Sequence, residues 1–295
     1  MFKHALVGVG DREGGVDAVA LARNLVSDKG RLTLGYVYPS DAYVWARARE
    51  TYHSAQREGG NQLLESVRSE MRIEAAQQCT SSPSIGRGLH ELAENLDVDL
   101  LVVGSSRRGP WGRVLLGDDT RDSLNGAPCA IAVAPSGYAD GAPAMRNIGV
   151  GYDSSAQSEH AMSVARALAR QLGAKLSACQ VVMFPPTLFI GARMPTEQDF
   201  DDLLVRARDH MTALDGVESH AVYGRTDEEL AAFGAGLDLL ILGSRDYGPV
   251  GRLLHGSTSQ RLARMARCPL LVLTRAAREA DSGNTARSGR EMPTI

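Results

Sequence analysis

The sequence is poor in lysine and in aromatic residues. Aromatic residues make up 5% of the chain, and of 32 basic residues only Lys3, Lys29 and Lys175 are lysine. We interpret the shortage of lysine as the codon bias of a GC-rich genome, not as a signal about phosphate binding. Together with 35 acidic residues, the basic residues leave a net charge of −3. That balance gives no reason to expect binding to nucleic acid or to a membrane surface.

Long apolar runs are also missing. No run approaches the ~20 residues that a helix needs to cross a bilayer. The first ten residues, MFKHALVGVG, lack the long apolar region and the small-residue cleavage site of a secretory signal. These absences predict a cytoplasmic protein without a membrane anchor.

Several catalytic and metal-binding motifs are absent from the sequence. There is no Gly-x4-Gly-Lys-(Ser/Thr) phosphate loop and no Gly-x-Ser-x-Gly nucleophile motif. The four cysteines form neither a C-x-x-C pair nor a zinc-like spacing with histidine. The sequence therefore predicts a protein that is not an enzyme, with a slow ATPase as the least favoured alternative.

What the sequence does contain is an internal duplication. Residues 99–133 and 238–272 align without a gap at an offset of 139 residues, the separation of Gly104 from Gly243. Both copies contain an apolar run, a loop rich in glycine and arginine, and a second apolar run. The equivalent cysteines, Cys129 and Cys268, precede that second run, so we expect both to be small buried hydrophobic residues. Two-fold repetition on this scale predicts two similar domains.

Short apolar strands alternate with amphipathic helical segments in each half. Strands are predicted at 5–9, 31–38, 73–77, 100–103, 130–134, 147–152, 175–182, 217–223, 239–242 and 270–273, and helices at 14–26, 62–71, 89–96, 119–124, 156–172, 198–214 and 227–236. This order predicts an α/β fold of two tandem, doubly wound, parallel five-stranded sheets. The domains are expected at residues 1–135 and 147–275, and residues 276–295 are expected to be a disordered tail.

Ligands of such folds bind beyond the carboxyl ends of the strands, where the strand order reverses. In the second half that edge includes Gly256, which permits close approach, and Ser257, a candidate N-cap. A helix N-terminus at this point would favour a phosphate group.

These residues resemble the universal stress protein family, present here as a tandem pair. The family pattern is Gly-x2-Gly-x9-Gly-(Ser/Thr) in the loop, with an Asp at the end of the first strand and a Val at the end of the second. The resemblance implies an adenine-nucleotide alpha hydrolase-like fold whose halves pair through their last strands about a pseudo-two-fold axis. It also implies ATP or AMP binding in many members, with Mg²⁺ expected only alongside ATP.

In the second repeat the resemblance places adenosine at the ends of the first two strands, and ribose and phosphates at the loop. The implied nucleotide-binding residues are Asp153, Val181, Gly243, Arg245, Asp246, Gly256, Ser257 and Thr258. One position departs from the pattern, because Asp246 stands where the family has its second glycine. Structural roles remain open at this stage: a strand end for Gly243, a turn or N-cap for Asp153, and an N-cap alone for Ser257. Val181 is expected in the core on either interpretation, and Arg245 more often on the surface.

The first repeat departs from the pattern three times. Its equivalents are Gly10 in place of the Asp, with Asp11 one position later, then Val37, Gly104, Arg107 in place of the second glycine, Gly117, and Asp118 in place of the Ser. A carboxylate at the position of Asp118 would repel a phosphate. The sequence therefore predicts that a nucleotide binds the second repeat and not the first.

The sequence thus predicts a regulatory stress-response protein that binds ATP or AMP weakly in its second repeat. An interaction scaffold with two degenerate pockets is the alternative. A homodimer and a protein partner of unknown kind are expected.

Overall fold

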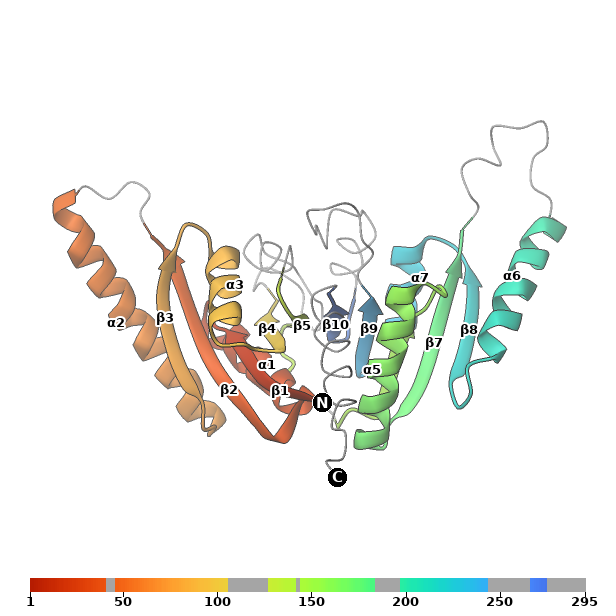
Figure 1. Cartoon of the computed structure of the whole chain (residues 1–295), viewed down its shortest axis with the longest axis horizontal. Helices are drawn as coiled ribbons and strands as arrows, with labels where there is room; N and C mark the ends of the chain where they lie inside the picture. The colour runs from red at the N-terminus through yellow and green to blue at the C-terminus, as the bar shows by residue number, and fades with distance from the viewer. Residues whose placement is uncertain (41–45, 106–126, 142–143, 184–196, 244–265, 275–295) are drawn as a thin grey trace, which may run out of the picture.

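In the described part of the chain, ten strands form one continuous sheet (Figure 1). The structure is a computed structural model and describes residues 1–40, 46–105, 127–141, 144–183, 197–243 and 266–274 of the 295-residue chain. The strand order is β3-β2-β1-β4-β5-β10-β9-β6-β7-β8. Equivalent strands of the two repeats lie at equal distances from the two edges of the sheet, as a pseudo-two-fold axis between β5 and β10 requires.

The first half alternates strands and helices in the predicted order. Its elements are β1 (Phe2–Gly8), α1 (Arg12–Leu25), β2 (Val26–Pro39), α2 (Ala46–Met71), β3 (Ala76–Ser82), α3 (Ile85–Asn95), β4 (Leu100–Gly104) and β5 (Ala130–Ala134). The second half has β6 (Asn147–Gly151), α5 (Ala156–Leu172), β7 (Lys175–Val182), α6 (Glu197–Thr212), β8 (Glu218–Tyr223), α7 (Thr226–Gly234), β9 (Leu239–Gly243) and β10 (Leu270–Leu273).

The two halves meet through their last strands. β5 and β10 pair antiparallel, with Leu271 opposite Ala132, whereas the pairs within each half are parallel. The predicted five-stranded sheets are therefore joined edge to edge into a ten-stranded one. The predicted pairing through the last strands is confirmed.

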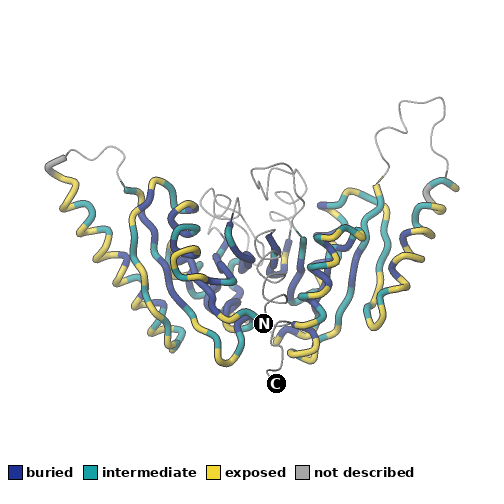
Figure 2. Tube along the Cα trace, viewed as in Figure 1, coloured by how far each residue is buried: buried dark blue, intermediate teal, exposed yellow. Residues whose placement is uncertain are grey.

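Two apolar clusters sandwich the sheet. One contains side chains of α1, α2, α5 and α6, and the other contains side chains of α3 and α7. Each cluster draws residues from both repeats, so the core is continuous across the β5–β10 junction. Figure 2 shows buried central strands and outer helices whose far faces are exposed. This double cover explains why the central strands are short apolar runs.

Most predicted elements agree with the structure, but β3 does not. The prediction of a strand at 73–77 was wrong in position, since β3 spans Ala76–Ser82. The strand is polar because it lies at the edge of the sheet and pairs with β2 alone, so much of it is exposed. Ile73 instead follows the end of α2, next to Arg72, whose φ is 48°.

Helix α2 is much longer than predicted. It begins at Ala46, sixteen residues before the predicted start at Gln62. Its added turns carry Tyr52 and His53, whose rings lie 6.4 Å and 5.7 Å from that of the buried Tyr38. Tertiary packing of aromatic rings, which a periodicity search does not detect, extends the helix.

An aspartate anchors the start of the first strand in each repeat. The Asp99 carboxylate accepts hydrogen bonds from the backbone N–H groups of Lys3 and His4 at 2.8 and 2.9 Å. Asp238 accepts from Arg146 and Asn147, both at 2.8 Å. The 139-residue separation of these aspartates extends the duplication to the polar contacts.

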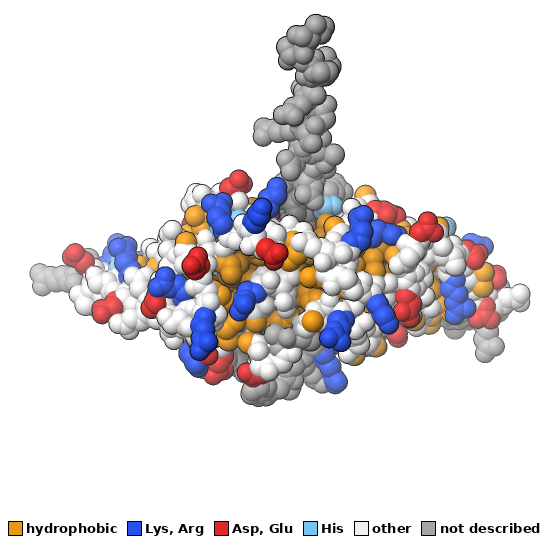
Figure 3. Space-filling view, turned by 90° about the horizontal axis from the view of Figure 1, so that it is seen from below, with side chains coloured by type: hydrophobic (Ala, Val, Ile, Leu, Met, Phe, Trp, Pro, Cys, Tyr) orange, Lys and Arg blue, Asp and Glu red, His pale blue; other side chains and the backbone are white. Residues whose placement is uncertain are grey.

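Figure 3 views the molecule from below, and acidic and basic side chains are interspersed on that face.

Cys129 and Cys268 are each 3% exposed, which confirms the prediction that they are buried. Burial raises the pKa of both thiols to about 12, so they stay protonated at neutral pH.

Among the described helices, none combines the length and apolar character needed to cross a membrane. The helix expected at 119–124 and the tail at 276–295 lie outside the described residues.

Candidate functional site

Three of the predicted second-repeat residues come together at the carboxyl edge of the sheet. β6 lies between β7 and β9, and Gly151 is opposite both Cys179 and Leu242. Asp153 and Val181 each follow that row by two residues, and Gly243 follows it by one. The strand order reverses between β6 and β9, which is where ligands of such sheets bind.

Asp153 is held in a turn between β6 and α5. Its Oδ1 accepts hydrogen bonds from the backbone N–H of Ser155 at 3.1 Å and from the Ser155 hydroxyl at 2.5 Å. Its own N–H donates to the Ser158 hydroxyl at 3.3 Å. Ser154, between them, has a left-handed φ of 60°. The turn role that the sequence left open for Asp153 is therefore present, and its carboxylate is positioned before any ligand arrives.

The N-cap of α5 is Ser155, not Asp153. Ser155 accepts from the backbone N–H of Ser158 at 3.2 Å, which satisfies one of the free donors of the first helical turn. In the same segment, the Tyr152 hydroxyl donates a hydrogen bond to the Glu159 carboxylate. Because Ser155 is the N-cap, the Asp153 carboxylate is not needed for capping and remains at the end of β6.

Gly243 and Gly104 have a packing role that accounts for both. A Cβ on Gly243 would lie 2.4 Å from the carbonyl oxygen of Gln157, and one on Gly104 would lie 2.4 Å from that of Gly14. Glycine is therefore required where β9 and β4 pass under the first turn of α5 and α1. A nucleotide is not needed to explain either glycine.

The two valines differ in burial. Val37 is 6% exposed and belongs to the apolar cluster beneath α3, whereas Val181 is half-buried at the margin of that cluster. Both valines were expected in the core; Val37 lies there, whereas Val181 is only partly buried at the edge of the sheet.

The first repeat presents a different edge. Gly10 occupies the position of Asp153, since Gly8 and Gly151 hold the same place in the sheet. Among the described residues, nothing lies within 4 Å of a Cβ built on Gly10. Asp11, one position later, is the N-cap of α1, and its Oδ1 accepts from the backbone N–H of Gly14 at 2.8 Å. The first repeat therefore uses its carboxylate to cap the helix.

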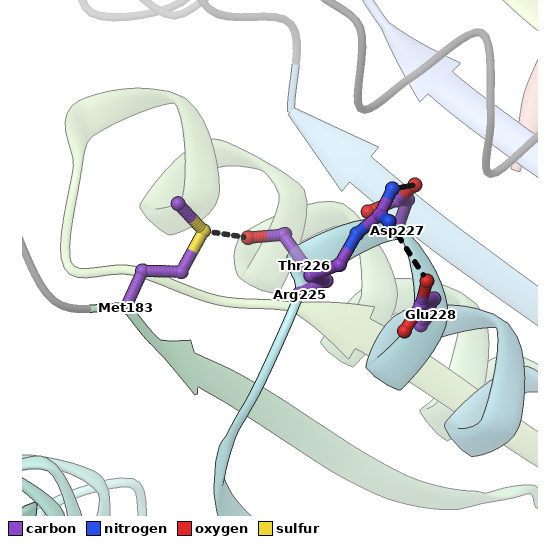
Figure 4. Close-up of polar contacts among 5 residues, drawn as sticks. All are labelled: Met183, Arg225, Thr226, Asp227 and Glu228. Carbon is purple, nitrogen blue, oxygen red and sulfur yellow. Dashed lines mark hydrogen bonds and ion pairs between the residues drawn. The ribbon is translucent and has the colours of Figure 1, made fainter.

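A group of residues that sequence reasoning missed lies at the end of β7, two residues beyond Val181. Met183 follows β7, and its sulfur lies 3.1 Å from the hydroxyl oxygen of Thr226, the first residue of α7 (Figure 4). Arg225 precedes the helix, and its guanidinium contacts Asp227 at 3.0 Å and Glu228 at 3.1 Å. The run Asp227-Glu228-Glu229 in one first turn was the available signal, because acidic residues favour helix N-termini.

Arg245, Asp246, Gly256, Ser257, Thr258, Arg107, Gly117 and Asp118 lie outside the described residues. Within the described ranges there is no group of three His, Cys, Asp or Glu side chains that could hold a metal ion.

Comparison with known proteins agrees with this architecture. The model of the universal stress protein family matches residues 1–135 and 145–274. A universal stress protein of Mycobacterium tuberculosis is 26% identical over 261 residues, which cover 82% of this chain and 86% of that protein. Another, from Thermus aquaticus, is 32% identical over 140 residues, 43% of this chain and 98% of its own length.

Solved structures show the same fold. The crystal structure of a universal stress protein from Archaeoglobus fulgidus superposes with a TM-score of 0.65 at 16% identity and covers 92% of this chain and 98% of its own. At that identity the likeness supports the fold alone. The family match covers both repeats, and the chain belongs to the universal stress protein family.

Proposed function

We propose that the protein is a non-enzymatic regulator of the stress response that binds ATP or AMP weakly, in its second repeat. Family membership supports the stress-response role. Nucleotide binding in the second repeat rests on the resemblance of its motif and on the geometry of the strand ends. A cytoplasmic location, and Mg²⁺ bound only together with ATP, are parts of the same proposal.

The observation that supports this function most directly is the position of Asp153. Its carboxylate lies at the strand-order reversal, beside Val181, and is fixed by Ser155. A carboxylate at that point can accept hydrogen bonds from the ribose hydroxyls or the base of a nucleotide. Because Ser155 holds the carboxylate in place, less conformational entropy is lost when a ligand binds.

The proposed asymmetry follows from the same edge of the first repeat. Gly10 offers no carboxylate there, and the Asp11 carboxylate already accepts a hydrogen bond from the first turn of α1. Asp118 further replaces the Ser that the family uses near phosphate. One nucleotide per chain is therefore expected.

The test is a binding measurement on the whole chain. Freshly purified protein is heat-denatured and its released nucleotide is identified, and AMP and ATP are then titrated by calorimetry. Asp153→Ala should weaken binding about tenfold, the cost of roughly one charge-assisted hydrogen bond. Ser257→Ala should weaken binding too, and Asp246→Gly should strengthen it by removing a negative charge.

Gly10→Ala is the matched control, since it changes the equivalent position of the first repeat and has space for a Cβ. Its affinity should equal that of the wild type. Two nucleotides bound per chain would overturn the asymmetry, and unchanged affinity in Asp153→Ala would remove the role of that residue.

The scaffold alternative predicts no retained nucleotide and no heat of binding with either ligand. For self-association, the β5 and β10 edges are already paired with each other. A homodimer would therefore have to use another surface, such as the open edges of β3 and β8 or a helical face. Light scattering at micromolar concentration separates the mass of one chain from that of two.

A further inference from the structure

Met183 differs from the other methionines near the core in its exposure. It is 55% exposed, whereas Met145, Met162 and Met211 are 4%, 2% and 0% exposed. It directly follows β7 and lies two residues beyond Val181, at the carboxyl edge of the second repeat.

The Met183 sulfur faces the start of a helix. Its Sδ lies 3.1 Å from Oγ1 of Thr226, and Figure 4 shows the side chain reaching from the end of β7 toward that hydroxyl. A thioether sulfur is a weak hydrogen-bond acceptor. In the reduced protein this contact therefore contributes little to the stability of α7.

Helix α7 begins without a side-chain cap. Asp11, Ser84 and Ser155 cap α1, α3 and α5 by accepting a backbone N–H of the first turn. The residue at that position of α7 is Arg225, which makes no side-chain cap hydrogen bond. Its guanidinium donates instead to Asp227. The N-terminal end of α7 would therefore gain from a strong acceptor beside Thr226.

A peroxide supplies such an acceptor by oxidising Met183. With hydrogen peroxide, the sulfur lone pair attacks one oxygen, and the S–O bond forms as the O–O bond breaks. The displaced hydroxide takes the proton from the sulfur-bound oxygen and leaves as water. The sulfur loses two electrons and the peroxide gains them. The product is methionine sulfoxide, which methionine sulfoxide reductases convert back.

We propose that Met183 is a reversible oxidation site and that its sulfoxide oxygen ties the N-terminus of α7 to the end of β7. The sulfoxide oxygen accepts from the Thr226 hydroxyl and lies at the positive end of the helix dipole. Because Met183 is exposed, the polar product stays in water. The same oxidation at Met162 or Met211 would place a polar group in the core. Oxidation at Met183 therefore tightens the edge of the second repeat, with or without a nucleotide.

The first measurement compares oxidation rates. The full-length protein is treated with graded hydrogen peroxide, quenched, digested and analysed by peptide mass spectrometry. Met183 should be oxidised about tenfold faster than Met162 and Met211, since susceptibility follows exposure. Methionine sulfoxide reductases A and B should together reverse the modification. Equal rates at the three positions would overturn the proposal.

The second measurement follows α7 by amide hydrogen exchange in reduced and oxidised protein. Oxidation should slow exchange in the first turn, at residues 227–229, by about threefold or more, the effect expected of one net hydrogen bond at the start of the helix. Met183→Leu should show no peroxide-dependent change there. Met183→Gln, whose amide oxygen is also an acceptor, should show the slower exchange without peroxide. Unchanged or faster exchange in α7 after oxidation of Met183 would overturn the proposal, because the sulfoxide would then not stabilise the start of the helix.

Discussion

The two repeats have equivalent first strands, but they differ in the three residues that follow each strand. After β6, the second residue is Asp153, and a further serine separates it from the cap of α5. After β1, the second residue is Gly10, and Asp11 itself caps α1. A shift of one position turns a carboxylate at the sheet edge into a helix cap. The difference shows how a duplicated fold can keep its helix start while losing a polar group at its candidate site.

What the repeats share is structural. Gly104 and Gly243 admit the first turn of a helix, and Asp99 and Asp238 anchor the start of a strand. Neither pair needs a ligand to explain it. The comparison therefore separates residues that build the fold twice from residues that differ at the site.

The largest effect is expected from the shared glycines. Gly104→Ala and Gly243→Ala would each place a Cβ 2.4 Å from a backbone oxygen, so strand and helix must separate. Each should lower the free energy of unfolding by about 3 kcal/mol. Urea unfolding measures this, with Gly10→Ala as the control in open space. A loss of stability in only one of the two variants would show that Gly104 and Gly243 are not equivalent.

The shared aspartates should come next. Asp99→Ala removes the acceptor for two backbone N–H groups, and Asp238→Ala does the same in the second repeat. We expect a loss of about 2 kcal/mol in each variant, and similar losses in both. Thermal unfolding compares them directly. A difference larger than about 1 kcal/mol between the two variants would show that the anchors are not equivalent.

A smaller effect should distinguish the first repeat. Asp17 is 5% exposed, and its oxygens accept from the backbone N–H groups of Gly137 and Ala139, both at 2.8 Å. Asn24 donates to the Tyr138 hydroxyl nearby, so the segment between the repeats docks on α1. Asp17→Asn should cost about 1 kcal/mol and speed amide exchange at 137 and 139. Unchanged exchange there would argue against this docking.

The same aspartate should make stability depend on pH. Desolvation by burial raises the Asp17 pKa above its ordinary value of 3.8, and the nearby Asp140 and Asp11 add to the shift, although the two backbone N–H groups oppose it. Protonation then favours the folded state. That contribution is complete below 3.8 and is lost as pH rises through the raised pKa. Urea unfolding should show that the difference in free energy of unfolding between the wild type and Asp17→Asn shrinks as pH rises across that window. A difference that grows with pH would contradict this prediction.

The smallest effect is expected from Gly10→Asp, which gives the first repeat the carboxylate it lacks. Nothing within 4 Å of the Cβ position opposes a side chain, so stability should change by less than about 0.5 kcal/mol. Nucleotide stoichiometry should remain at one per chain, because Arg107 and Asp118 are unchanged. Calorimetry that found a second site would show that the missing aspartate alone had closed the first repeat.

The hydrophobic pattern and the 139-residue repeat were sufficient to predict the α/β class and the two-fold organisation, and the family resemblance implied the pairing through the last strands. Strands β5, β7 and β10 and helix α5 have the predicted bounds. The reason is local, because a strand buried on both faces must be apolar along its whole length. The candidate site at the strand ends was also predictable, since Asp153 and Gly243 follow predicted strands and Val181 lies near the end of one.

Only the tertiary structure decided what the edges of the sheet and the helix ends do. β3 is a largely exposed edge strand, and the first turns of α2 pack through the rings of Tyr52 and His53 against Tyr38, so neither segment has the run of aliphatic residues that predicts an element. Whether Gly104 ends a strand or admits a helix depends on Gly14, ninety residues earlier in the chain. The contact of Met183 with Thr226 likewise joins a strand end to a helix start 43 residues away. The sequence determined which segments are buried, because burial follows composition and period, whereas these roles depend on which distant backbone the fold brings within reach.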